Sequence, residues 1–295
     1  MYDFSLDRYK VFSVVSETGS FTAASKLLHI SQSAVSQSIL RLEKDLNLKL
    51  FNREPRGIKL TETGHELYSY IRRAMIIIES GENRMDEIKG QGSTTISIGT
   101  GDALCRHILL PSLTKFSKLY PQIKVKITNS TSKNSVNLLI EGKVDFALAH
   151  NNGDHQSNLE YDNTVELNLI AVAIKGYKLP AKPFTLGDFT KVPLILLDNT
   201  TTTRRLIDDH FEANEVSVSP EFTTASTDSM LDLARAGLGV AIVTEKFIDS
   251  MKGIEKIEGD YNFPNRYATL ISREDTSLSK AAKNLYDTIL GDNKD

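Results

Sequence analysis

The stretch FTAASKLLHISQSAVSQSILRLEKDLNLKLF, residues 21–51, holds two short amphipathic patterns separated by a few polar residues. The first pattern predicts a short helix whose apolar residues are Ala23, Ala24, Leu27 and Leu28. The second predicts a helix whose buried face, at a spacing of i, i+4, i+7 and i+11, carries Val35, Ile39, Leu42 and Leu46. Two helices joined by a turn of three or four residues are the sequence form of a helix-turn-helix.

Capping residues predict where the helices of this region begin. Ser5 can cap an earlier helix that ends at Gly19, Ser20 or Thr22 can cap the second helix, and Ser31 the third. The third helix then keeps a polar outer face formed by Gln32, Ser33, Ser36, Gln37 and Arg41. Glutamine can pair with adenine and arginine with guanine, so this face is suited to reading the major groove. Short polar helices are also common in proteins that bind no DNA, and the pattern alone leaves both interpretations open.

A predicted β-hairpin follows the third helix. Residues 48–51 and 58–60 are strand-like and flank the turn Pro55-Arg56-Gly57, which is the form of a wing. The whole chain of 295 residues has a net charge of -3, but residues 41–60 hold six basic and three acidic side chains. We expect phosphate or minor-groove contacts from Arg53, Arg56 and Lys59.

Residues 19–64 resemble the winged helix-turn-helix of LysR-type transcriptional regulators. The resemblance is carried by Ala23-Ala24, Ser31-Gln32, Ala34-Val35-Ser36, Leu42-Glu43, Leu50-Phe51 and Leu60-Thr61. Two positions depart from the family pattern: Ser33 stands where proline is frequent, and Leu46-Asn47 where leucine-glycine is frequent. The resemblance implies a bacterial, ligand-responsive regulator that binds double-stranded promoter DNA and is not an enzyme.

Residues 64–92 predict a linker helix and hinge after a DNA-binding domain at residues 1–63. Apolar residues in steps of four and three form a coiled-coil seam, from which we predict dimerisation through Leu67, Ile71, Ala74, Ile78 and Met85. The alternative is that this stripe packs on its own domain. The family resemblance favours the dimer and implies a homotetramer and a possible contact with RNA polymerase.

Residues 93–295 alternate strand-like and helical runs, which predicts an α/β fold in two lobes. Lobe I takes about residues 93–163 and 266–295, and lobe II residues 164–265. The segments EGKVDFALAH and ARAGLGVAIVTE resemble the effector-binding domain of the same family, which is itself similar to periplasmic binding proteins.

Ligands of open α/β sheets bind beyond the carboxyl ends of the strands, so we expect a small-molecule effector between the lobes. The candidate residues are Thr100, Gly101, Asp102, Asn129, Ser130, Thr131, His150, Thr200, Thr201, Thr202 and Thr203. Each hydroxyl could instead be an ordinary helix cap. Asp102 would repel an anion and suit an amine, and the charge of the effector stays open.

The remaining motifs give little sign of other chemistry. The lone Cys105 could be redox-active at a helix start or could simply pack, and no second cysteine is present to resolve an oxidised form. The six histidines lack metal-ligand spacing, so we expect no metal and no cofactor. Two alternatives are an enzyme that carries a DNA-binding domain and the solute-binding protein of a transporter. The first would need a set of catalytic residues and the second an export signal, and the sequence shows no recognisable pattern for either. We therefore expect a cytoplasmic protein without membrane contact.

Overall fold

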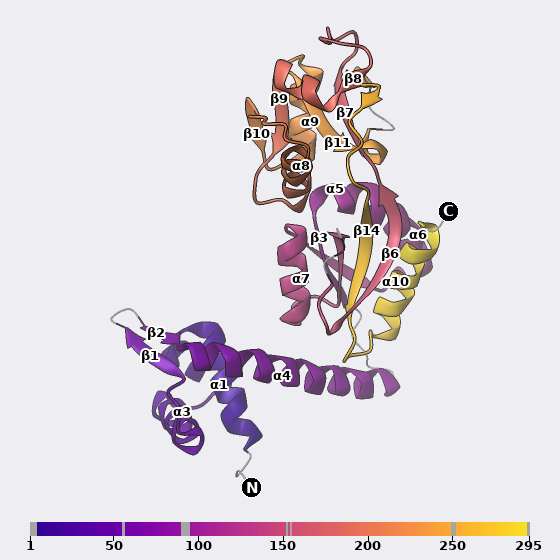
Figure 1. Cartoon of the computed structure of the whole chain (residues 1–295). Coiled ribbons are helices and arrows are strands. Elements are labelled where there is room, and N and C mark those ends of the chain that lie inside the picture. Colours follow the sequence, from indigo (N-terminus) through magenta and orange to yellow (C-terminus); the bar gives the residue numbers. More distant parts are fainter. Residues whose placement is uncertain are drawn as a thin grey trace. The chain divides into compact units, whose positions relative to one another are not determined.

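The computed structural model describes residues 5–54, 57–89, 95–151, 153, 155–248 and 252–293. The chain divides into two compact units, Met1–Met85 and Asp86–Asp295 (Figure 1). In the described part of the chain, no helix is both long and apolar enough to cross a membrane.

Three helices open the N-terminal unit, and serine caps set two of their starts. They are α1 (Leu6–Thr18), α2 (Phe21–Leu28) and α3 (Gln32–Leu46). Gly19 ends α1 with a left-handed φ of 61°. The Ser20 hydroxyl accepts a hydrogen bond from the Ala23 N–H at 3.3 Å, so Ser20 rather than Thr22 caps α2. The Ser31 hydroxyl accepts from the Ala34 N–H at 3.1 Å, which confirms the predicted cap of α3.

The exit from α3 explains one departure from the family pattern. Asn47 caps the helix in the left-handed region, at φ 53°. Glycine adopts this conformation freely and asparagine is among the few other residues that tolerate it. Asn47 can therefore replace glycine without a change of fold.

The wing begins later than predicted. Its strands are β1 (Phe51–Glu54) and β2 (Gly57–Leu60), which pair antiparallel, whereas a strand was expected over residues 48–51. The reason is Glu43, whose Oε1 accepts the N–H groups of Leu50 at 2.8 Å and Phe51 at 3.3 Å. Pro55 and Arg56 lie outside the described residues, as does the side chain of Arg53.

The long helix α4 (Glu62–Ile88) has two differently placed halves. Leu67 and Ile71 pack into the core of the N-terminal unit with Val35 and Phe12, and only 9% of Ile71 is exposed. For this end of the stripe the alternative holds, and these two residues are not free to face a partner. Beyond Ile71 the helix extends past the three-helix bundle (Figure 1). Ile77, Ile78 and Met85 are exposed there, as is Tyr70 just before Ile71, whereas Ile76 is buried.

Glycine is required where α4 passes the wing. A Cβ added at Gly64 would lie 2.2 Å from the carbonyl oxygen of Leu50. No side chain fits at that distance, so the glycine that follows Leu60-Thr61 in sequence serves a close backbone approach.

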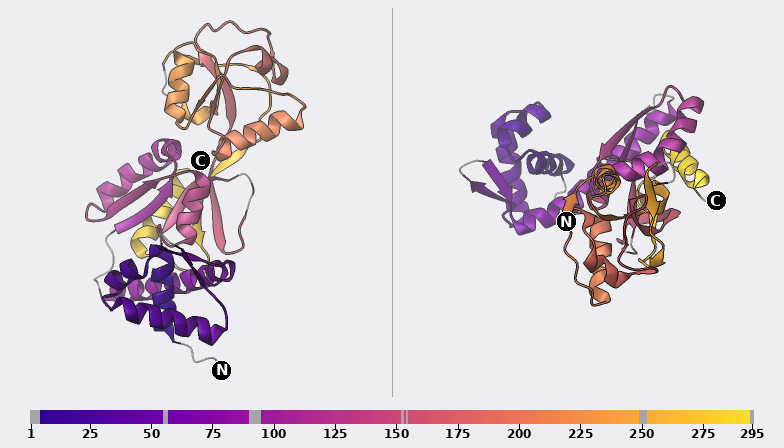
Figure 2. Two further views of the ribbon diagram at one scale, coloured as in Figure 1. Left: turned by 90° about the vertical axis from the view of Figure 1, so that its left-hand side faces the viewer. Right: turned by 90° about the horizontal axis from the view of Figure 1, so that it is seen from above.

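Lobe I of the C-terminal unit is a five-stranded sheet in the order β4-β3-β5-β14-β6. The strands are β3 (Thr95–Thr100), β4 (Lys124–Asn129), β5 (Phe146–Asn151), β6 (Leu159–Leu167) and β14 (Arg266–Arg273). Helix α7 (Ser132–Ile140) covers one face, and α6 (Leu110–Leu119) and α10 (Lys280–Asp292) cover the other (Figure 1). The C-terminal α10 packs beside α6 although the two are far apart in sequence (Figure 2).

Lobe II is a second five-stranded sheet in the order β10-β9-β11-β7-β12. Its strands are β7 (Leu169–Ile174), β9 (Leu194–Leu197), β10 (Phe222–Thr224), β11 (Val240–Thr244) and β12 (Ile254–Lys256). Its helices are α8 (Thr202–Ala213) and α9 (Thr227–Arg235), with the 3₁₀ turns η2 (Leu186–Lys191) and η3 (Glu245–Phe247). A small separate pair joins β8 (Phe184–Thr185) and β13 (Gly259–Asp260).

The two lobes share one apolar core. Neighbouring strand residues alternate between clusters: Val172 and Ile195 face a core that also contains Ile98 and Leu285 of lobe I, whereas Ala171 and Leu194 face a core within lobe II. The lobes are therefore packed together on one side of each sheet.

Two sequence-based predictions need correction. The single helix expected over residues 103–119 is divided into α5 (Asp102–Leu104), a π-helical turn η1 (Cys105–Leu109) and α6. Pro111 stands in the first turn of α6 and has no N–H to donate to the preceding helix. Strand β6 was not predicted, because its sequence LEYDNTVEL mixes exposed charges with few apolar residues.

Replacing Glu43 by alanine should destabilise the N-terminal unit selectively. The change leaves the buried Leu50 N–H and its neighbour without an acceptor, which costs about 1–3 kcal/mol. Hydrogen–deuterium exchange resolved by peptide should show faster exchange in α1 and α3 and no change in the C-terminal unit. E66A, at an exposed position of α4, is the matched control. Exchange equal to that of E66A would contradict the capping role of Glu43.

Candidate functional site

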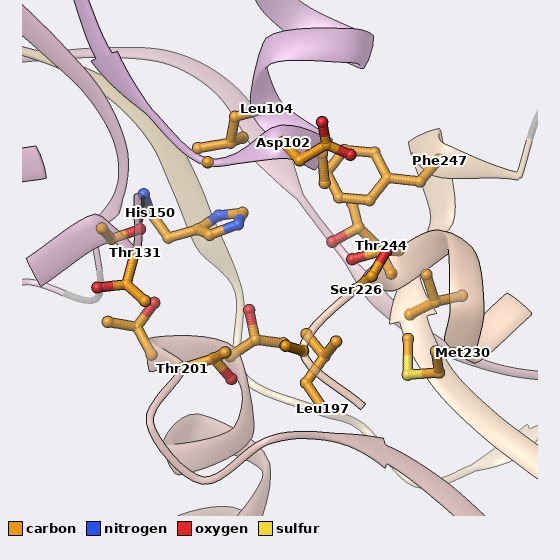
Figure 3. Close-up of a pocket in the computed structure, with 18 of the residues that line it drawn as sticks. Asp102, Leu104, Thr131, His150, Leu197, Thr201, Ser226, Met230, Thr244 and Phe247 are labelled. Atoms are coloured by element: carbon orange, nitrogen blue, oxygen red, sulfur yellow. Dashed lines mark hydrogen bonds between the residues drawn. The ribbon is translucent and has the colours of Figure 1, made fainter. Parts of the chain in front are cut away.

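A pocket of about 390 Å³ lies between the two lobes of the C-terminal unit (Figure 3). Four strand-to-helix junctions reach it, those that follow β3, β4, β9 and β10. Arg266 at the start of β14 and the β11 end at Thr244 complete the wall. Because helices α7, α8 and α9 begin at these junctions, their N-terminal amides and the positive ends of their dipoles lie at the pocket.

Nine of the eleven residues predicted for the effector site line this pocket. They are Gly101, Asp102, Asn129, Ser130, Thr131, His150, Thr201, Thr202 and Thr203. Thr100 and Thr200 do not line it. The Thr100 side chain is wholly buried in the sheet of lobe I, and Thr200 is exposed, with its N–H donated to Asp198 at 2.9 Å.

The hydroxyl groups of the pocket divide between caps and other partners. Thr131 accepts from the Asn134 N–H at 3.3 Å and Thr201 from the Arg204 N–H at 3.1 Å, so both are helix caps. Ser226, by contrast, makes no side-chain cap at α9. The capping interpretation thus holds for two residues and does not account for the others.

Asp102 lies at the rim and is already paired. Its Oδ2 is 3.1 Å from Nη2 of Arg106, and the same guanidinium nitrogen lies 2.7 Å from Oδ2 of Asp228. Asp102 and Arg106 belong to lobe I and Asp228 to lobe II, so this ion-pair network crosses from one lobe to the other. The Asp102 side chain is 55% exposed. Its charge is directed to Arg106 and to solvent rather than to the pocket floor.

Two basic side chains line the pocket, Arg266, which is buried, and His150, which is half-buried. Arg266 is 2% exposed and donates to Thr203 Oγ1 at 2.5 Å and to Thr244 Oγ1 at 2.6 Å. Burial lowers the pKa of Arg266 to about 9, which leaves it charged at neutral pH. Burial and the Arg266 charge hold the pKa of His150 well below its usual range, so this imidazole is neutral. In Figure 3 the His150 ring points into the pocket.

Sequence reasoning missed Arg266, Thr244, Ser226 and the apolar wall formed by Leu104, Leu197, Met230 and Phe247. One signal could have found Arg266. It stands two and four positions before the buried Ala268 and Leu270, so strand alternation places it on the same face as those residues.

The predicted DNA-reading face lies on the outside of α3. Gln32, Ser33, Gln37 and Arg41 are exposed and Ser36 is half-buried, because Val35, Ile39 and Leu42 take the inner face. Arg41 forms no hydrogen bond or ion pair with another residue within the described ranges. Lys59 on β2 is exposed as well. The arrangement leaves a polar helix face open to a large polar ligand.

Cys105 is placed for packing rather than for reactivity. It lies against the shared apolar core, and burial, with a smaller effect of Asp102, raises the pKa of its thiol. The thiolate is the reactive form, so a raised pKa lowers reactivity at neutral pH. Within the described residues no group of three or more His, Cys, Asp or Glu side chains could hold a metal ion.

A winged helix-turn-helix joined to a two-lobed α/β unit with an inter-lobe pocket defines a ligand-responsive transcription regulator. The family described as "LysR substrate binding domain" matches residues 89–293, and "Bacterial regulatory helix-turn-helix protein, lysR family" matches residues 6–65. The chain belongs to the LysR family of transcriptional regulators.

Similar proteins include a probable RuBisCO transcriptional regulator of Emiliania huxleyi, 27% identical over 82% of this chain and 79% of that protein. The HTH-type transcriptional regulator YvbU of Bacillus subtilis is 27% identical over 84% of each chain. Among solved structures, a full-length variant of OxyR from Pseudomonas aeruginosa has a TM-score of 0.72 at 17% identity and covers 98% of this chain and 95% of its own. At that identity the likeness concerns the fold alone.

The Cys105 thiol should react slowly with iodoacetamide at pH 7, with a rate that rises only above the usual pKa range of a thiol. The physical reason is that burial and Asp102 both disfavour the thiolate. Because Cys105 is the lone cysteine, mass spectrometry of the alkylated chain reports on it directly, and C105S supplies the blank. A reaction midpoint at or below pH 7 would contradict the packing role and favour redox sensing.

Proposed function

We propose that this regulator binds promoter DNA through α3 and the wing and senses a small-molecule effector in the pocket between its lobes. The observation that carries the proposal is the pocket itself, because four strand-to-helix junctions from two lobes line a single cavity of about 390 Å³. We keep the division predicted from the sequence, with residues 1–63 as the DNA-binding domain, 64–92 as the linker helix and hinge, and 93–295 as the effector-binding domain.

The effector acts by binding the two arrangements of the lobes unequally. A ligand that contacts both lobes can stabilise one arrangement of the lobes over another. The size of this effect equals the difference between its binding free energies for the two arrangements. The pocket supports such a difference because Thr131 and His150 belong to lobe I and Thr201 and Ser226 to lobe II. The change in lobe arrangement would then alter how an oligomer holds its operator.

DNA recognition is assigned to the predicted residues on α3 and the wing. Gln32, Ser33, Ser36, Gln37 and Arg41 read bases and nearby phosphates from the major groove, and Arg53, Arg56 and Lys59 contact the backbone beside it. The exposure of the α3 residues and of Lys59 supports this assignment.

Gln37→Ala should reduce discrimination between a selected operator and random DNA by about 1–3 kcal/mol, since it removes one bidentate base contact. Lys59→Gln should weaken both kinds of complex alike and reduce the salt slope by about 1. Fluorescence anisotropy with a site selected from a random library and a scrambled duplex, at several salt concentrations, measures both. Equal loss on the two duplexes for Q37A would remove Gln37 from the reading set.

Dimerisation is assigned to the exposed half of the α4 stripe. Ala74, Ile78 and Met85 remain from the sequence-based prediction, and Tyr70 and Ile77 join them because they are 57% and 45% exposed. With Gly81 these residues follow one another in steps of three, four or one, which keeps them on one face of the helix. Pairing with α4 of a second copy buries that face. A tetramer of two such dimers, a contact with RNA polymerase and a cytoplasmic location complete the proposal on family grounds.

Ile77→Lys together with Ile78→Lys should dissociate the α4 pair, because two charges would be buried without partners. Light scattering after size-exclusion chromatography should show a fall toward the monomer mass of 32.8 kDa. E79K, on the opposite face of α4, is the matched control and should keep the wild-type mass. An unchanged mass for the double variant would locate the dimer interface elsewhere.

A further inference from the structure

Arg266 is a buried cation without a counter-ion. It is 2% exposed, and both of its hydrogen bonds go to uncharged hydroxyls, those of Thr203 and Thr244. Its Nε has no hydrogen-bond partner. No carboxylate of a described residue pairs with it, and burial alone accounts for its lowered pKa.

A charge in such a place is unfavourable for folding. Moving an unpaired ion out of water costs several kcal/mol even after the protein relaxes, and hydroxyl groups offset only part of this. Of the described residues that line the pocket, Asp102 alone is acidic, and its half-exposed carboxylate pairs with Arg106 at the rim. The positive charge of Arg266 in the pocket lining is therefore unbalanced.

His150 is a second unsatisfied group at the same pocket. Its backbone N–H donates a hydrogen bond to the Ser132 hydroxyl, but Nδ1 of its ring is buried without a hydrogen-bond partner. In the described parts of the chain three buried side-chain polar atoms lack a partner, and two of them, His150 Nδ1 and Arg266 Nε, belong to pocket-lining residues. Buried polar atoms normally have a hydrogen-bond partner in native proteins, so both atoms are candidates for a hydrogen bond to a polar ligand.

Apolar side chains also line the pocket, with the hydroxyls of Ser226 and Thr244 among them (Figure 3). Figure 3 shows His150 and Thr131 on one side of the pocket and Met230 and Phe247 on the other. Leu104 and Leu197 add further apolar surface to the lining. A ligand that contacts both the unsatisfied polar groups and these apolar side chains carries a polar head and an apolar substituent, and a volume of about 390 Å³ limits it to a small molecule.

We propose that the effector is a small monocarboxylate with an apolar substituent, and that its carboxylate binds at Arg266. This rests on the proposed sensing function of the pocket and specifies its ligand. One guanidinium balances one negative charge, and its fork of N–H donors matches a carboxylate. The neutral His150 imidazole supplies one further hydrogen bond, and the apolar wall receives the substituent.

A ligand bound at Arg266 contacts a residue that is hydrogen-bonded across the two lobes. Arg266 begins β14 of lobe I, and its two partners Thr203 and Thr244 belong to α8 and β11 of lobe II. A carboxylate bound to this guanidinium engages the group that already links the lobes. Charge recognition and lobe arrangement thus meet at one residue.

The test compares matched probes on the full-length protein at constant ionic strength. Acetate, hexanoate and benzoate are set against hexanamide, benzamide, benzylamine and inorganic phosphate in thermal-shift and calorimetric titrations. Hexanoate or benzoate should raise the melting temperature and bind roughly 10- to 100-fold more tightly than its amide, because a charge-assisted hydrogen bond is lost in the amide. R266Q should abolish this preference, R266K should keep part of it, and R205Q, at an exposed arginine of α8, should leave it unchanged.

The unliganded variants supply a second readout. A charge that lacks a partner does not stabilise the fold, so R266M without ligand should melt no lower than wild type. A large fall in melting temperature would make Arg266 a structural residue and overturn the proposal. Equal binding of benzoate and benzamide, a preference kept in R266Q, or no binding of any carboxylate would overturn it too. Tighter binding of benzylamine or phosphate would overturn the proposed ligand class but leave the pocket as a sensing site. Failure of the wild-type protein to bind any selected operator, with or without ligand, would instead contradict the proposed function.

Discussion

The pairing of β14 with β6 is the constraint on which the C-terminal unit depends. The two strands run antiparallel from Arg266 opposite Leu167 to Arg273 opposite Leu159, with a bulge between Ala268 and Thr269. β6 ends at Leu167 and β7 begins at Leu169, so the chain passes from lobe I into lobe II within one residue. It returns to lobe I at Arg266, beside the point where it left. The two crossings are hydrogen-bonded neighbours, and any relative motion of the lobes is centred on them.

This pairing also determines which chemistry reaches the pocket. Because the two crossings pair with each other, the side chain of the first residue of β14 is buried among elements of both lobes and lines the pocket. This position holds an arginine, although an apolar residue there would give a more stable fold. A buried charge that only two hydroxyl groups compensate is the kind of locally unfavourable feature expected at a functional site.

The sequence predicted the parts of the structure that are decided locally. The caps at Ser31 and Gly19 and the apolar face of α3 depend on residues within one or two helical turns, and all are present. The strand ends that line the pocket were also found, since hydrophobic runs followed by Ser, Thr or Asn are local patterns. Strand β6 and the β14 register depend on residues about a hundred positions apart in the chain, and the partners of Arg266 lie 63 and 22 positions away from it. No pattern in a single sequence contains that information.

The linker helix illustrates the same limit at the level of packing. Helical periodicity correctly placed Leu67, Ile71 and Ile78 on a common apolar stripe. Periodicity does not indicate which part of the protein, or which partner, packs against that stripe. Leu67 and Ile71 are covered by the unit's own core, whereas Ile78 is 40% exposed. The division follows from length, because α4 continues beyond the bundle that it packs against.

The relative strengths of the inter-lobe contacts indicate what can drive the response. The Arg106–Asp228 ion pair joins the lobes, but its side chains are 52% and 34% exposed, and ion pairs this open to solvent contribute about 0–1 kcal/mol. Allosteric coupling typically requires about 1–3 kcal/mol. The ion pairs are thus too weak to hold one arrangement against a ligand. A charge-assisted bond to a buried group contributes about 1.5–3 kcal/mol, which is enough to decide between two arrangements. For the proposed sensing function, control of the lobe arrangement therefore belongs at the buried Arg266 rather than at the exposed ion pairs.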